Sequence, residues 1–150
     1  MTRYQKIAIG LILLIALGIR IHAAFHDNTS VLRGDATSYD GIAMSLVLGK
    51  GYRYGAGTGE LTASRVPLYP LFLAAIYRVG GHSYRAVRIV QAVLSTLTVL
   101  LIALWAHRLF GGLSACFTAL IASIYPAFYA YYFSCTALTA ETLYVFLLTA

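Results

Sequence analysis

Residues 7–24 read IAIGLILLIALGIRIHAA, an apolar run whose one permanently charged side chain is Arg20. As a helix with a rise of ~1.5 Å per residue, this run is just long enough to span the ~27–30 Å hydrocarbon core of a bilayer. The whole chain is 60% hydrophobic and 11% charged, whereas soluble domains carry about 25% charged residues. The sequence therefore predicts an all-α, polytopic transmembrane protein.

A cleaved signal peptide is the competing interpretation of this run, because the basic residues Arg3 and Lys6 precede it. Against it, the run is long, and no clear small-x-small cleavage site precedes the next charged residues. These features favour a retained anchor. A cytoplasmic N-terminus is expected as well, with Arg3 and Lys6 on the cytoplasmic side, and this orientation rests partly on the family resemblance given below. The next loop is rich in arginine, but the positive-inside rule is weak for loops that approach about 60 residues.

Three further apolar runs predict transmembrane helices at about 89–105, 113–133 and 137–150. Pro126 is expected to kink the third of these helices, because proline removes a backbone hydrogen bond inside a helix. The last run reaches residue 150 without a charged flank. We therefore expect residues 1–150 to be the N-terminal part of a larger transmembrane domain.

Residues 25–84 form a long, mostly polar connection between the first two expected spans, and we expect it to be the first extracytoplasmic loop. Within it, apolar residues recur at helical spacing over 39–48, which predicts a short helix with one apolar face. A second short helix is expected over 68–78. Both are too short to cross a bilayer, so they are predicted to be interfacial helices.

Carboxylates are scarce and grouped in this sequence. Four of the five acidic residues lie between residues 27 and 60, namely Asp27, Asp35, Asp40 and Glu60. The fifth, Glu141, is embedded in apolar sequence. Because an ionisable group in hydrocarbon usually faces a partner or a cavity, Glu141 is a candidate substrate-binding residue. The alternative is that Glu141 lies near the start of a helix, close to water.

The sequence predicts neither a cofactor nor a structural metal. Cys116 and Cys135 lie in apolar runs and are interpreted as small buried hydrophobic residues. There is no CxxC motif and no His/Cys cluster with zinc spacing, although this does not decide whether a divalent metal is needed. The net charge of +6 predicts binding to membrane lipids or to a lipid phosphate, and not to nucleic acid.

The loop carries three ordered sequence features. Residues 35–43 follow Asp-x-x-x-Tyr-x-x-x-Ala, a glycine-rich stretch comes next, and residues 65–70 read RVPLYP. Placed after a first transmembrane helix, this order resembles the N-terminal region of GT-C superfamily glycosyltransferases. The branch that it resembles contains protein O-mannosyltransferases and lipid A aminoarabinose transferases. The resemblance covers nearly the whole chain.

The resemblance implies an enzyme of the bacterial inner membrane. Such enzymes transfer a sugar from a polyprenyl-phosphate carrier to a hydroxyl group of a lipid, glycan or protein acceptor outside the cytoplasm. By position, Asp35 corresponds to the family's catalytic carboxylate, which can take the acceptor's proton. Arg65 and Arg88 would bind the anionic phosphate. Tyr39, one helical turn from Asp35, would orient the Asp35 carboxylate or contact the sugar.

The chain also departs from this family, and the same residues have simpler interpretations. Many relatives have a second carboxylate directly after the catalytic one, where this chain has Ala36. Asp40 could partly replace this second carboxylate, but on a helix the Asp40 side chain projects away from that of Asp35. Asp40 is therefore interpreted as a solvated surface residue. Asp35 could be only a helix N-cap, and Arg65 could be a membrane-anchoring side chain.

Two other classes of protein fit the composition. A transporter would carry its ionisable residues at mid-membrane depth in discontinuous helices, whereas here they gather in a loop. A non-catalytic membrane subunit would tolerate loss of Asp35 and Arg65. The glycosyltransferase hypothesis is preferred because it accounts for the residue types in the loop.

Overall fold

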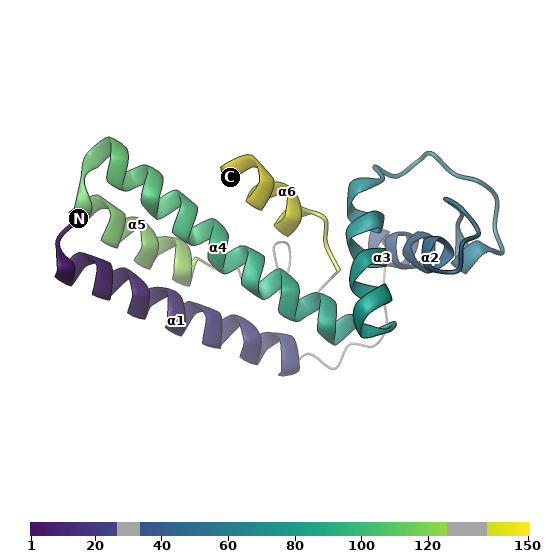
Figure 1. Cartoon of the computed structure of the whole chain (residues 1–150), viewed down its shortest axis with the longest axis horizontal. Helices are drawn as coiled ribbons and strands as arrows, with labels where there is room; N and C mark the ends of the chain where they lie inside the picture. The colour runs from purple at the N-terminus through teal and green to yellow at the C-terminus, as the bar shows by residue number, and fades with distance from the viewer. Residues whose placement is uncertain (27–33, 126–137) are drawn as a thin grey trace. The chain divides into compact units, whose positions relative to one another are not determined.

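The computed structural model describes residues 1–26, 34–125 and 138–150 (Figure 1). In these ranges the regular structure is helical, apart from one antiparallel bridge between Arg53 and Leu61. The all-α prediction is therefore confirmed. The chain divides into two compact units, one formed by residues 1–27 and 88–150 and the other by residues 28–87. We call them the membrane unit and the loop unit.

The membrane unit contains α1 (Arg3–His26), most of α4 (Tyr84–Phe110), α5 (Gly112–Ile124) and α6 (Glu141–Thr149). Within the described ranges, α1 and α4 are the two helices that are long and apolar enough to cross a membrane. Large apolar side chains are exposed along α1 and α5, as expected where lipid is the solvent. Examples are Leu11, Leu14, Ile15, Phe117, Ile121 and Ile124.

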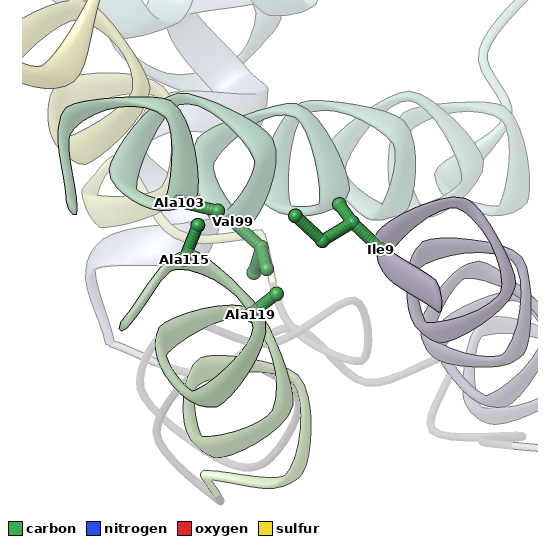
Figure 2. Packing of buried hydrophobic residues seen from close by; sticks show 5 residues of the cluster. All are labelled: Ile9, Val99, Ala103, Ala115 and Ala119. Carbon is green, nitrogen blue, oxygen red and sulfur yellow. The ribbon is translucent and has the colours of Figure 1, made fainter. Parts of the chain in front are cut away.

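Small side chains let α1, α4 and α5 approach closely. Figure 2 shows Val99 and Ala103 of α4 packed with Ala115 and Ala119 of α5 and with Ile9 of α1. All five side chains are buried. Membrane helices associate largely through this kind of van der Waals packing, because lipid provides no hydrophobic driving force between them.

The described part of the third expected span is shorter than the sequence suggests. The helix α5 ends at Ile124, and Tyr125 has an extended backbone with φ −67° and ψ 121°. The cause is Pro126, whose ring disfavours the helical conformation in the preceding residue. Residues 126–137, which include the expected kink, Cys135 and the start of the fourth expected span, lie outside the described ranges. Cys116 is half-buried on α5.

The loop unit is built on two helices, α2 (Asp35–Val47) and α3 (Leu68–Gly80), with a short 3-10 turn, η1 (Gly55–Gly57), between them. The two helices bury Ile42 and Ala43 of α2, and Tyr69 and Leu73 of α3. The observed α2 begins four residues before the expected start at residue 39, so Asp35 lies in its first turn. The interfacial location of both helices stays a prediction.

A glycine-rich hairpin connects α2 to α3. Its backbone hydrogen bonds join Thr62 N to Tyr52 O at 3.1 Å and Tyr54 N to Glu60 O at 3.3 Å. Gly57 has a φ of +87°, and a Cβ atom there would collide with the Lys50 side chain, so only glycine fits. The hairpin turns the chain back, which brings the segment before α3 to the start of α2.

Candidate active site

An ion pair joins Asp35, the expected catalytic carboxylate, to Arg65, an expected phosphate ligand. Arg65 Nη2 donates to Asp35 Oδ1 at 2.5 Å, across 30 positions of the chain. Asp35 is the first residue of α2, and Arg65 lies at the end of the hairpin, shortly before α3. The Asp35 side chain is 65% exposed and that of Arg65 is 30% exposed. The pair is therefore accessible to a ligand.

Tyr39 supports the arginine of this pair. Its ring centroid lies 5.6 Å from Arg65 Cζ, a distance at which a guanidinium is attracted by the face of an aromatic ring. The ring of Tyr39 also meets that of Tyr69 edge to face, with centroids 5.0 Å apart. Because Tyr69 is fully buried, it anchors Tyr39. The structure thus links Tyr39 to Arg65, where the sequence analysis expected a role beside Asp35 or the sugar.

The backbone of Arg65 is held as well. The Tyr52 hydroxyl donates to the Arg65 carbonyl oxygen at 3.0 Å. The Nε atom of Arg65 is buried and has no hydrogen-bond partner among the described residues. The guanidinium therefore keeps donor capacity beyond its bond to Asp35.

The interpretation of Asp35 as a helix N-cap alone is wrong. Gly34 occupies the N-cap position, with φ 60° and ψ −130°, and no side-chain cap bond forms there. A left-handed backbone of this kind suits glycine. Asp35 instead starts the helix, where a carboxylate interacts favourably with the unpaired backbone N–H groups of the first turn, and its side chain is directed to Arg65.

Asp40 has a different set of partners and is not a solvated surface residue. Its carboxylate accepts hydrogen bonds from Tyr77 Oη at 2.7 Å, His82 Nε2 at 2.8 Å and Tyr84 Oη at 3.2 Å. The Asp40 side chain is only 15% exposed. Burial, together with the hydrogen bond to Asp40, raises the pKa of Tyr77 far above its usual value. Asp40 therefore ties α2 to α3 and to the start of α4.

These contacts predict that Asp40→Ala destabilises the protein by about 1–3 kcal/mol, because the buried Tyr77 hydroxyl loses its acceptor. Thermal unfolding of the purified protein in detergent measures this loss. Tyr77→Phe combined with Asp40→Ala is the control, since removing both partners of a buried hydrogen bond costs less than removing one. Equal destabilisation by the single and the double variant would contradict this account.

Arg88 and Glu141 belong to the membrane unit, whereas Asp35, Tyr39 and Arg65 belong to the loop unit. Arg88 is buried on α4. Glu141 is the first residue of α6 and is exposed, which agrees with the alternative that it lies near a helix start. The substrate-binding roles of both residues stay predictions.

The helix α4 carries a buried polar face that was not predicted from the sequence. Gln91 and Ser95 lie there three and seven positions after Arg88, and all three side chains are buried. Arg20 of α1, fully buried, donates from Nε to Ser95 Oγ at 3.1 Å, and Gln91 Nε2 donates to the Thr139 carbonyl oxygen at 3.0 Å. The i, i+3, i+7 spacing of polar residues in an apolar helix is the signal that could have found it.

No group of three or more His, Cys, Asp or Glu side chains suited to a metal ion occurs in residues 1–26, 34–125 and 138–150. Those ranges therefore offer no preformed metal centre. The expectation that no cofactor is needed stays a prediction.

Comparison with known proteins identifies the family. The family model for dolichyl-phosphate-mannose-protein mannosyltransferases matches residues 64–150, which is more than half of the chain. The match contains Arg65, Arg88 and Glu141 and begins after Asp35 and Tyr39. No curated protein and no solved structure matches the chain. The resemblance to GT-C glycosyltransferases is thus confirmed: the chain belongs to the dolichyl-phosphate-mannose-protein mannosyltransferase family, whose members are membrane glycosyltransferases of the mannosyltransferase type.

Proposed function

We propose that the protein takes a sugar from a polyprenyl-phosphate carrier and transfers it to a hydroxyl acceptor on the extracytoplasmic side of a bacterial inner membrane. The N-terminus is cytoplasmic in this proposal, so the loop unit faces the acceptor. The ion pair between Asp35 and Arg65 carries the proposal. It brings together a carboxylate that can accept a proton and a guanidinium that can bind a phosphate.

In the proposed reaction, the acceptor hydroxyl oxygen forms a bond to the anomeric carbon of the sugar. The bond between that carbon and the phosphate oxygen breaks, and its electron pair leaves with the polyprenyl phosphate. The hydroxyl proton passes to Asp35, which acts as general base. Asp35 is accessible enough to reach an acceptor, because most of its side chain is exposed.

Negative charge develops on the phosphate as it leaves, and cations near its oxygens stabilise the transition state. Arg65 suits this role because guanidinium N–H groups can donate two parallel hydrogen bonds to a phosphate. Tyr39 and Tyr52 hold Arg65 in place. Arg88 of α4 is the second proposed phosphate ligand, and Glu141 is a proposed sugar or acceptor ligand.

Sugar transfer by the full-length protein in liposomes tests the proposal, with a panel of polyprenyl-phosphate sugars as donors. We expect transfer from at least one lipid-phosphate donor, and no transfer from the corresponding nucleotide sugar. Transfer from the nucleotide sugar would contradict the donor class. Failure of the folded protein to transfer from every lipid donor would favour a non-catalytic membrane subunit.

A further inference from the structure

In the structure, Arg65 binds the carboxylate that is proposed to act as base. The Nη2 atom of the cationic guanidinium donates to Asp35 Oδ1, so the two side chains form an ion pair. An oxygen that accepts this bond has one lone pair fewer to offer to an acceptor hydroxyl. The guanidinium, in turn, cannot give the same N–H group to a phosphate.

The pair is nevertheless easy to separate. Exposed ion pairs are weak, because water solvates both partners and holding two long side chains in one geometry costs entropy. Here 65% of the Asp35 side chain and 30% of the Arg65 side chain are exposed. An anionic ligand at this position would therefore have only a weak ion pair to displace.

Arg65 does not depend on Asp35 for its place. The Tyr39 ring lies 5.6 Å from Arg65 Cζ, and Tyr52 binds the Arg65 carbonyl oxygen at 3.0 Å. Both contacts are independent of the carboxylate. If Asp35 is displaced, Arg65 stays where it is with an additional N–H group ready for a new acceptor.

We propose that the phosphate of the lipid donor displaces Asp35 from Arg65, and that this exchange releases the Asp35 carboxylate to act as base. This inference rests on the proposed function and adds an order to it: the donor binds before the acceptor is activated. Without donor, Arg65 Nη2 is bonded to Asp35 Oδ1.

Equilibrium binding of polyprenyl phosphate, without sugar or acceptor, tests the exchange in the full-length protein reconstituted in nanodiscs. We expect Asp35→Asn to bind this lipid about two- to fivefold more tightly than the parent protein, which is the factor that corresponds to the strength of an exposed ion pair. The gain arises because Arg65 no longer has to leave a carboxylate.

Two controls separate exchange from simple removal of negative charge. In an Arg65→Gln background, Asp35→Asn should no longer tighten binding, because there is no guanidinium to release. Glu60→Gln, at an exposed carboxylate of the same loop unit, should leave the affinity unchanged. If Asp35→Asn binds no more tightly than the parent protein, or if its gain persists without Arg65, the exchange is overturned.

The test also distinguishes this inference from the proposed function. Tighter binding by Asp35→Asn together with undiminished sugar transfer would support the exchange and contradict the role of Asp35 as base. An affinity of Asp35→Asn equal to that of the parent protein, together with lost transfer, would support the base and contradict the exchange. Absence of binding in every variant would overturn both, since each requires a lipid phosphate at Arg65.

Discussion

Replacing Asp35 with asparagine is expected to lower the rate of sugar transfer by about 10²–10⁴-fold, the usual contribution of a positioned general base. Asparagine has nearly the same shape as aspartate, so the start of α2 should be preserved. Its amide cannot take the proton of an acceptor hydroxyl. The measurement is kcat for transfer by the full-length protein in liposomes at saturating donor.

Glu60→Gln is the matched control, because Glu60 is an exposed carboxylate in the same loop unit. It should transfer at the parent rate. If Asp35→Asn keeps the kcat of the parent protein, another group accepts the proton. Asp40 and Glu141 would then be the next candidates for the base. Asp40 would be the less attractive of these two, because three hydrogen-bond donors already bind its carboxylate.

Arg65→Met is expected to lower kcat by about 10²–10³-fold, as does the loss of one preorganised donor to a developing anion in other enzymes. Methionine keeps an apolar stem of similar reach for the Tyr39 ring and removes the charge. The kcat of Arg65→Lys should lie between those of Arg65→Met and the parent protein, since lysine keeps the charge and lacks the planar guanidinium group. Transfer rates across a range of donor concentrations separate kcat from KM.

Arg78→Met is the control for this series, because Arg78 is an exposed arginine in the last turn of α3. Its kcat should match that of the parent protein. If Arg65→Met raises KM and leaves kcat unchanged, Arg65 contributes only to ground-state binding of the donor. Its proposed action on the leaving phosphate would then be wrong.

The identities of Asp35 and Arg65 could be predicted from sequence, but their contact could not. Both residues stand in motifs whose order after a first apolar helix suggests a family. Their pairing depends on the glycine-rich hairpin, in which positive-φ residues such as Gly57 set the return path of the chain. Short-range patterns predict that a turn is present, but they do not predict where its ends meet.

Asp40 illustrates the same limit more sharply. Its three donors lie 37, 42 and 44 positions away in sequence. The residues near Asp40 in sequence therefore predict only that it is a polar residue on a short helix. The period of a helix is enough to predict that Asp40 projects away from Asp35. The burial of Asp40 depends on the packing of α3 against α2, which the period does not reveal.

The hydrogen bond from Arg20 to Ser95 bears on how the protein is made. The two residues are 75 positions apart, so at about 5–20 residues per second the ribosome needs roughly 4–15 s to supply Ser95 after Arg20 has been synthesised. During that interval α1 carries an arginine that hydrocarbon tolerates poorly. The nascent first helix is therefore expected to remain beside the insertion machinery, or near the bilayer surface, until α4 has emerged. Release of α1 into lipid and arrival of α4 would then be a single step in biogenesis.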